Sequence, residues 1–332
     1  MKEPAFSNYH VTDQQSAFTL VAALRQFRPG DSWATLRRLV GNRHVEVNGT
    51  VCVNETRKLK AGDVVKVWSE PRNPLPQPED LRIRYLDRHI VVVEKPAGVT
   101  TLRHPEERFW PKRRKQFQPT LDEMLRDILA RKQAGKPAAA AKRRRRAPFL
   151  RAVHRLDRDT SGLMVFALSP AAERKLVHMF RKHAMQRVYL AIVQGCVAEQ
   201  TFESHLVQDR GDGLRGSTDL PGVGRRAVTH VRPLQQLEDY TLIECRLETG
   251  RTHQIRIHLA EAGHPVCGEK VYCRRRFGRA LADRSGAPRQ ALHAAELGFN
   301  HPITGEPLHF EMPLPRDLSR LLARLSAADR AT

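Results

Sequence analysis

The chain has 332 residues, of which 40% are hydrophobic and 28% charged, an ordinary globular composition with room for two domains. Lys and Arg number 57 against 36 Asp and Glu, which gives a formal net charge of +21. Self-repulsion on this scale opposes compaction, so the charge indicates a polyanionic partner. Nucleic acid is a commoner one than a membrane surface or an acidic protein. No apolar run approaches the ~18 residues of a membrane-spanning helix, which excludes an integral helical membrane protein.

The cysteines are scattered and odd in number, and no two have the C-x2-C spacing of a zinc site. They are Cys52, Cys196, Cys245, Cys267 and Cys273. The N-terminal residues MKEPAFSNYH lack the apolar segment of a secretory signal peptide. We therefore expect thiols rather than disulfides, in a soluble cytoplasmic protein.

Residues 16–68 have the pattern of a compact unit that begins with two short helices. Leu20 and Leu24 share one helical face in the first. Ser32 then offers an N-cap for the second, which spans residues 33–40.

The next segment, residues 44–53, predicts a β-hairpin, because it holds an Asn-Gly pair between valines. A two-residue loop would place the valines of the two strands on opposite faces. A three-residue loop, residues 48–50, pairs Val47 with Val51 and gathers the valines on one face, so it is the register we expect.

Two basic helices, this hairpin and a closing strand at residues 64–68 resemble the alpha-L RNA-binding motif, the fold of ribosomal small-subunit protein four. The resemblance implies a domain at residues 1–69 with a phosphate-facing surface. That surface would consist of Arg25, Arg28, Arg37, Arg38 and Arg43. The same arginines could equally solvate two helices without binding RNA.

A Pro-rich stretch at residues 70–80 predicts a stiff linker. A buried strand at 90–94 follows and ends in a Lys-Pro-Ala-Gly turn, residues 95–98. Residues 103–149 form a basic, low-complexity insertion with one helical stretch at 120–130. Since such a segment buries little apolar area, we expect a mobile arm, and its cationic clusters favour contact with RNA phosphate over a solvated loop without a role. The second cluster is Lys142, Arg143, Arg144, Arg145 and Arg146.

From residue 150 onward, strands and helices alternate. We expect strands at residues 163–168, 188–193 and 240–247. Ser169 caps a helix that has Pro170 at its first position. Thr252 is the expected cap of another helix, which ends at Gly263. The residues that this helix turns inward are Ile255, Leu259 and Ala262.

Two stretches concentrate residues suited to chemistry. The first, residues 154–162, reads HRLDRDTSG and places Asp157 between arginines. Flanking guanidinium groups favour an ionised carboxylate, and a tight Thr-Ser-Gly turn holds its backbone. The second, residues 249–258, reads TGRTHQIRIH, with Arg251 at a helix start and Arg256 one turn along the helix. On residue type alone, Asp157 would be a salt-bridged or turn-capping carboxylate.

Together, the two stretches resemble the RluA-type pseudouridine synthases, the ribosomal large-subunit uridine isomerase family. Further segments fit in the same order: KPAG at residues 95–98, RVYLA at 187–191 and GHPV at 263–266. The resemblance implies an α+β fold, with a catalytic domain at residues 81–325 that is interrupted by the insertion. Its core would be a mixed, mostly antiparallel sheet flanked by helices.

The family's roles carry over to the matching positions. Asp157 would be the nucleophile or base that starts the isomerisation, and Arg256 would pair with it and keep it ionised. Tyr189 would pack against the flipped uracil and is the candidate acceptor of the proton from C5. Arg155 would hold RNA phosphate or help to extrude the base, and Arg251 would support the same loop.

The reaction implied by the resemblance breaks the N1–C1′ bond, rotates the uracil and rejoins it through C5, so neither a cofactor nor a metal is expected. The partner would be RNA whose target uridine is flipped out of its stem. Large-subunit ribosomal RNA is the family's commonest target, and transfer RNA is the alternative.

Three positions depart from the family's pattern. Arg187 stands where Lys is usual, Glu269 where Asp is usual, and Cys273 where Gly often follows the Tyr. We expect none of the three to touch the catalytic constellation.

Two other classes of protein remain open at this point. A metal-dependent hydrolase could use His253, His258 and His264 as zinc ligands, although the first two lie about 140° apart around a helix. A catalytically inactive RNA-binding or ribosome-assembly factor could keep the basic segments alone. Such a protein would be expected to have lost Asp157, Tyr189 or Arg256, and all three are present.

Overall fold

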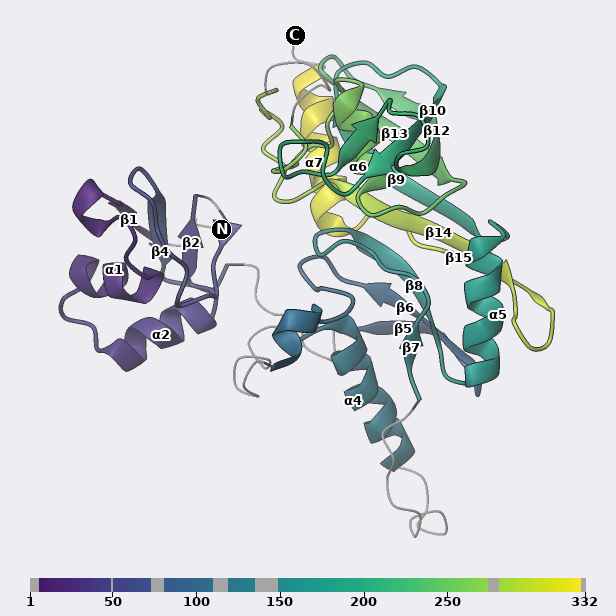
Figure 1. The fold of residues 1–332 in the computed structure, drawn as a ribbon, viewed down its shortest axis with the longest axis horizontal. Helices are drawn as coiled ribbons and strands as arrows, with labels where there is room; N and C mark the ends of the chain where they lie inside the picture. The colour runs from purple at the N-terminus through teal and green to yellow at the C-terminus, as the bar shows by residue number, and fades with distance from the viewer. Residues whose placement is uncertain are drawn as a thin grey trace. The chain divides into compact units, whose positions relative to one another are not determined.

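The computed structural model describes residues 6–48, 50–72, 81–109, 119–134, 149–273 and 281–329. The chain divides into two compact units, shown as ribbons in Figure 1. The smaller unit comprises Met1–Pro76 and Arg103–Pro119, and the larger comprises Gln77–Leu102 and Thr120–Thr332. Most of the expected linker, residues 70–80, lies outside the described ranges.

The smaller unit is a four-stranded antiparallel sheet with two helices. The strands, in the order β1-β4-β2-β3, are β1 (Phe6–His10), β4 (Val64–Trp68), β2 (Val45–Val47) and β3 (Thr50–Val51). A 3-10 turn (Asp13–Gln15) precedes the helices, which are α1 (Leu20–Phe27) and α2 (Trp33–Gly41). As predicted, Ser32 caps α2 by accepting a hydrogen bond from Thr35 N at 3.1 Å. Leu20, Leu24 and Leu36 are fully buried in the core of this unit.

The hairpin of β2 and β3 has a two-residue loop, so the expected three-residue loop is wrong. Val47 pairs with Thr50. Asn48 has a φ of +52°, the left-handed conformation that favours a two-residue hairpin turn. Its side chain fastens the turn to β4 by donating to Asp63 Oδ1 and accepting from Val64 N, each at 2.8 Å.

The valine pattern was a poor guide to this register because the second strand buries a cysteine. Cys52 is 6% exposed and donates its N–H to Val45 O at 2.8 Å, whereas Val51 and Val53 are only half-buried. A free cysteine packs as a small apolar residue, so the inward position shifts by one along the strand.

The larger unit is built on an 11-stranded sheet. Its main order is β11-β10-β12-β13-β9-β14-β8-β6-β5, with β15 beside β14 and β7 beside β8. All pairings are antiparallel except β8 with β14. The strands are β5 (Arg82–Leu86), β6 (Ile90–Lys95), β7 (Arg151–Ala152), β8 (Ser161–Ala167), β9 (Gln186–Gln194), β10 (Gln200–Val207), β11 (Gly216–Thr218), β12 (Arg225–Gln236), β13 (Tyr240–Leu247), β14 (Leu292–Asn300) and β15 (Pro307–Glu311). The mixed, mostly antiparallel sheet confirms the predicted fold class.

Helices pack on both faces of this sheet. On β6, Val91 and Val93 join one core with α4 (Leu121–Ala134), α6 (Gln254–Glu261) and α7 (Arg316–Asp329). Ile90 and Val92 join a second core with α5 (Pro170–Arg181). A strand buried on both faces must be apolar throughout, which explains the continuous Ile-Val-Val-Val run. Burial of each such side chain stabilises the fold by about 1.5–3 kcal/mol.

The insertion at residues 103–149 is not one solvated arm. Helix α4 coincides with the helical stretch predicted within it, and Leu121, Met124 and Leu125 are fully buried in the main core. A 3-10 helix (Pro105–Phe109) precedes the first basic cluster, Lys112–Lys115. That cluster and Lys142–Arg146 lie outside the described residues. The expectation of a mobile arm is therefore wrong for α4 and stays untested for the basic clusters.

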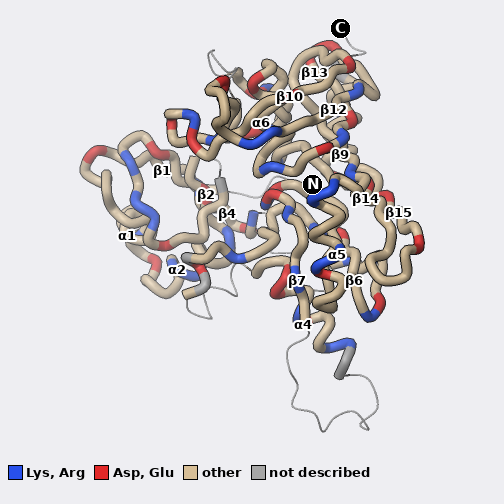
Figure 2. Tube along the Cα trace, turned by 45° about the vertical axis from the view of Figure 1, so that its right-hand side comes forward, with Lys and Arg blue, Asp and Glu red and all other residues tan. Residues whose placement is uncertain are grey.

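Cationic residues occur along the described parts of both units, as the blue segments in Figure 2 show. The excess of Lys and Arg is thus not confined to the two clusters in the insertion. Among the described helices, none has the length and apolar character needed to cross a membrane.

Candidate active site

Asp157 lies in the loop between β7 and β8, and the segment after β6 holds this loop in place. Thr101 Oγ1 donates to Leu156 O at 2.9 Å and accepts from Leu156 N at 3.2 Å. Gly98 N donates to Arg158 O at 2.8 Å. The loop closes on itself through a hydrogen bond of 3.2 Å to Asp157 O from the N–H three residues further on. The tight turn thus spans residues 157–160, and the Thr-Ser-Gly turn expected at 160–162 is wrong, because Ser161 and Gly162 belong to β8.

Lys95 is fully buried beside this loop. Its Nζ donates to Pro96 O and Arg158 O, each at 2.9 Å, and to Thr160 O at 2.7 Å, so every donor of an ammonium group has an acceptor. Burial lowers the pKa of Lys95 to about 7. One side chain thus ties the turn after β6 to the segment that directly follows Asp157, a role that the KPAG motif alone did not reveal.

The far end of the loop is fixed by a close approach of β8 to β14. Gly162 has a φ of +126°, and a Cβ there would lie 2.2 Å from Ala294 O, so a side chain is excluded. Ser161 Oγ is 2.9 Å from His293 Nδ1 and accepts from Arg289 Nη2 at 3.1 Å. The far end of the loop is therefore anchored to the buried strands β8 and β14.

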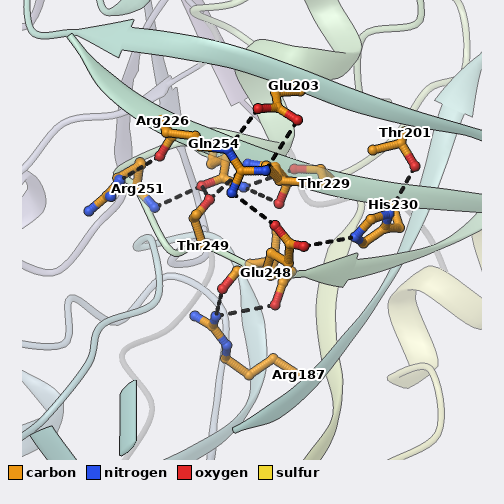
Figure 3. Close-up of polar contacts among 12 residues, drawn as sticks. Arg187, Thr201, Glu203, Arg226, Thr229, His230, Glu248, Thr249, Arg251 and Gln254 are labelled. Carbon is orange, nitrogen blue, oxygen red and sulfur yellow. Dashed lines mark hydrogen bonds and ion pairs between the residues drawn. The ribbon is translucent and has the colours of Figure 1, made fainter. Parts of the chain in front are cut away.

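The second chemical stretch is organised by Gln254, which is buried. Its Oε1 accepts from Thr249 Oγ1 at 2.7 Å and from Arg251 N at 3.0 Å. Its Nε2 donates to Val228 O at 2.9 Å and to Thr229 Oγ1 at 3.0 Å. Figure 3 shows Gln254 at the centre of these contacts. The loop between β13 and α6 is therefore fastened to β12.

Helix α6 differs from the prediction at both ends. It begins at Gln254, and no side chain caps it, so the expected cap at Thr252 is wrong. Ala262 is exposed rather than inward, because the helix ends at Glu261. Residues 254–260 are all buried, so polar side chains of α6 must find partners inside the protein.

Arg256, on α6, is the partner of Asp157. Its Nη1 donates to Asp157 Oδ2 at 2.9 Å. Its Nε and Nη2 donate to Glu269 Oε2 and Oε1, each at 2.7 Å. Although burial opposes the charged form, the hydrogen bond to Glu269 and the charges of both carboxylates raise the pKa of Arg256. Arg256 therefore bridges two acids as a permanent cation.

Glu269 is itself held by the backbone. Its Oε1 accepts hydrogen bonds from the N–H groups of residues 270–272 at 3.0, 2.9 and 3.3 Å. Burial alone would favour its neutral form, but the hydrogen bond and charge of Arg256 lower the pKa of Glu269. The expectation that position 269 does not touch the catalytic constellation is wrong. The side chain of Glu269, longer than that of the usual Asp, accepts two hydrogen bonds from the guanidinium that also binds Asp157.

His253 also lies at this site, where sequence reasoning gave it no role except as a zinc ligand. It precedes α6 in the left-handed conformation, with a φ of +61°, which is uncommon outside glycine. Its Nε2 is 3.7 Å from Asp157 Oδ1, and its Nδ1 is 2.7 Å from the Tyr272 hydroxyl. Burial lowers the pKa of His253, so the imidazole is neutral at neutral pH. Its position between Arg251 and Arg256 in the motif was the sequence feature that could have placed His253 at this site.

A cavity of about 560 Å³ opens beside Asp157, within the usual size range of small-molecule sites. Tyr189, on β9, lines it and is 8% exposed; burial raises the pKa of its phenol. Arg155 and Arg251 line it as well. Arg251 Nε donates to Arg226 O at 3.1 Å. The structure thus brings Asp157, Tyr189, Arg155 and Arg251 to one cavity. Arg256 does not line it but is bonded to Asp157.

The arginines predicted for the smaller unit do not all suit RNA binding. Arg37 and Arg38 are exposed on α2. Arg43 is 4% exposed, and its Nε donates to Arg72 O at 3.4 Å, so its assignment to a phosphate-facing surface is wrong. The φ of +69° at Arg43, just after α2, turns this side chain into the unit rather than outward.

The three histidines weighed as zinc ligands have separate partners. His258 lies between Ser204 Oγ and Thr229 Oγ1, at 3.0 and 2.9 Å, and His264 Nδ1 is 3.0 Å from Gln194 O. Within the described ranges, no group of three or more His, Cys, Asp or Glu side chains is placed to hold a metal ion. All five cysteines are free thiols.

Comparison with known proteins agrees with this geometry. Residues 89–261 match the family described as RNA pseudouridylate synthase. Ribosomal large subunit pseudouridine synthase D of Zymomonas mobilis is 34% identical over 326 residues, which cover 96% of this chain and 98% of that protein. The uncharacterized RNA pseudouridine synthase YlyB of Bacillus subtilis is 35% identical over 299 residues, covering 87% and 88%.

Among solved structures, human RNA pseudouridylate synthase domain containing 4 is similar in fold. It has a TM-score of 0.55 at 24% identity and covers 73% of this chain and 92% of that one. The family match spans the strands that carry the loop of Asp157 and all of α6. The chain therefore belongs to the RNA pseudouridylate synthase family and is an RNA-modifying isomerase.

Proposed function

We propose that this pseudouridine synthase isomerises a uridine of large-subunit ribosomal RNA, with Asp157 as the attacking group. The observation that carries the proposal is the bond of Asp157 Oδ2 to Arg256 beside a cavity that Tyr189 also lines. Relatives named ribosomal large subunit pseudouridine synthase D support the choice of RNA. Transfer RNA is the alternative substrate.

The two oxygens of Asp157 have different environments, which gives each a role. Oδ2 accepts the hydrogen bond from Arg256 and is held by it. Oδ1 accepts none within the described residues, since His253 Nε2 at 3.7 Å is beyond hydrogen-bond range. Oδ1 is therefore the oxygen free to attack, and the guanidinium keeps the carboxylate ionised and aimed.

Tyr189 supplies a buried ring for the extruded uracil. During the isomerisation the N1–C1′ bond breaks, a C5–C1′ bond forms, C5 loses a proton and N1 gains one. Because burial raises the pKa of Tyr189, its phenol is protonated at neutral pH. Its hydroxyl therefore accepts the C5 proton while passing its own proton to solvent, which protonates N1, rather than acting as a phenolate.

Flipping the target uridine out of a stem costs a few kcal/mol, which contacts to the RNA backbone must offset. Arg155 and Arg251 line the cavity and are placed to provide them. The exposed Arg37 and Arg38 and the cluster Lys142–Arg146 would extend this binding, and the last of these lies outside the described residues.

Pseudouridine mapping of total RNA, with and without the gene, tests the proposal. We expect a position in large-subunit RNA to lose its pseudouridine in the deletion strain and to regain it with the wild-type gene but not with Asp157→Asn. A position lost from transfer RNA instead would reject the ribosomal substrate. If no position is lost, the inactive RNA-binding or assembly factor is the better explanation.

A further inference from the structure

Arg187, on β9, is a buried cation that has no acidic partner among the described residues. It is 9% exposed, and its Nη2 donates to the backbone oxygens of Leu247 and Glu248 at 3.2 and 3.1 Å. Within the part of the chain that the structure describes, neither its buried Nε nor its Nη1 has a hydrogen-bond partner. Burying a charge without a counter-charge costs several kcal/mol, so such a group is kept where a ligand supplies the anion.

Glu248, the acidic residue nearest in sequence to these backbone contacts, already pairs with other side chains. Figure 3 shows Arg187 reaching the backbone of Glu248, while the carboxylate of Glu248 turns toward Arg226 and His230. Glu248 Oε2 accepts from Arg226 Nη1 at 3.2 Å. The guanidinium of Arg187 is thus left with two neutral carbonyl oxygens, and its charge is not cancelled by the described residues.

The surroundings of Arg187 leave room for its guanidinium. A Cβ at Gly250 would lie 2.6 Å from Arg187 Nη1, so a side chain there would require the guanidinium to shift. The guanidinium carbon lies 5.6 Å from the ring centroid of Phe180, a position that favours a cation. Arg187 and Gly250 both line the cavity beside Asp157.

The rest of the cavity wall near Arg187 is cationic. Arg181 is exposed at the end of α5 and lines the cavity with Arg155 and Arg251. Asp157 is the single carboxylate among the described residues that line it. A wall of this kind favours an anionic ligand.

We infer that this cationic wall, centred on Arg187, binds a phosphodiester of the RNA strand that carries the target uridine. The inference rests on the proposed function, because it assigns a subsite for the same substrate. Arg187 and Tyr189 are two residues apart and face the same side of β9. They therefore lie about 7 Å apart along the strand, a distance that one extended nucleotide spans. The base beside Tyr189 and an adjoining phosphate can thus be bound together.

Salt-dependent binding of a short fluorescent oligouridylate tests the subsite without requiring catalysis. Each phosphate that a protein cation neutralises makes the slope of log K against log salt more negative by about 0.7 for a single strand. Arg187→Gln removes one such contact, so we expect its slope to be less steep by that amount, with affinity about ten-fold weaker at low salt. Arg187→Lys keeps the charge and should keep the slope, with weaker binding because the planar fork is lost.

Arg232→Gln is the matched control, since Arg232 is exposed, paired with Glu244 and absent from the cavity wall. If Arg187 had only a structural role, Arg187→Gln would lower the unfolding temperature and leave the slope at its wild-type value. That result would overturn the inference. If Arg187→Gln does not fold, Arg181→Gln tests the same wall at an exposed residue. An unchanged slope in that variant would also overturn the inference.

Pseudouridine formation is measured separately on the same wild-type preparation. If the wild type is active and neither substitution changes the slope, the subsite is rejected and the proposed function stands. If the wild type is inactive and the substitutions change the slope, the proposed function is rejected and the anion site stands. Failure of the wild type to bind oligouridylate at all overturns the subsite.

Discussion

Replacing Glu269 by Gln should weaken both the fold and the catalysis. The amide oxygen of Gln can take the place of Oε1, which accepts from Arg256 Nη2 and from three backbone N–H groups. The amide nitrogen must then face Arg256 Nε, where Oε2 accepts at 2.7 Å in the wild type. The amide nitrogen and Arg256 Nε are both donors, so they would oppose each other. Asp157 would then be the one carboxylate left, among the described residues, to compensate the charge of the buried guanidinium.

The magnitude follows from this geometry. Loss of one partner of a buried ion pair costs about 3–5 kcal/mol, and the retained oxygen puts Glu269→Gln near the lower end. Because Arg256 holds Asp157, a shift of its guanidinium by about 1 Å should slow the single-turnover rate on the order of 100-fold. RNA affinity should stay within about two-fold, since Glu269 is buried away from the substrate.

Urea unfolding and single-turnover pseudouridine formation measure the two effects. Glu203→Gln is the control, because Glu203 pairs with Arg226 at 2.7 Å but about half of each side chain is exposed. Exposed pairs contribute about 0–1 kcal/mol. If Glu269→Gln shifted the free energy of unfolding no more than Glu203→Gln and left the rate unchanged, the buried ion pair would not stabilise the site.

Three other predictions concern the loop, the tyrosine and acid stability. Gly162→Ala should destabilise the protein by about 3 kcal/mol or more, because its Cβ would meet Ala294 O at 2.2 Å. Gly98→Ala, whose Cβ meets nothing within 4 Å, should cost only the about 1 kcal/mol of its strained φ; thermal unfolding compares the two. Tyr189→Phe keeps the ring, so RNA affinity should persist while turnover falls on the order of 100-fold, and unchanged turnover would exclude the hydroxyl from proton transfer. Burial lowers the pKa of three histidines to about 3 or 4, whereas the unfolded chain protonates them near 6.5. Stability that is present above pH 6.5 should therefore be lost as the pH falls, by about 2 kcal/mol per histidine at pH 5, and a urea midpoint independent of pH in this range would contradict it. These histidines are His154, His258 and His293.

The elements that could be predicted are those in which the spacing of apolar residues along the sequence reflects which side chains are buried. Strand β6 is apolar on both faces because helices cover both, and Ser169 with Pro170 marks the start of α5 by local geometry alone. The pairing of Asp157 with Arg256 also followed from the sequence, through the resemblance of two long motifs to one family.

The errors arose where an outcome depends on distant partners. Glu269 reaches Arg256 only because the segment after α6 folds back over the helix, and no local pattern encodes that contact. Arg43 carries the same charge as its exposed neighbours, yet its left-handed backbone sends its side chain inward. The hairpin register failed because Cys52 filled a core position that the pattern assigned to valine.

The rate of pseudouridine formation by purified Asp157→Asn, on RNA that the wild type modifies, bears most directly on the chemistry. The amide keeps the shape of the carboxylate and removes its charge and nucleophilicity, so RNA should bind within about two-fold of the wild type and yield no product. Product formed at a rate near that of the wild type would contradict the role of this side chain.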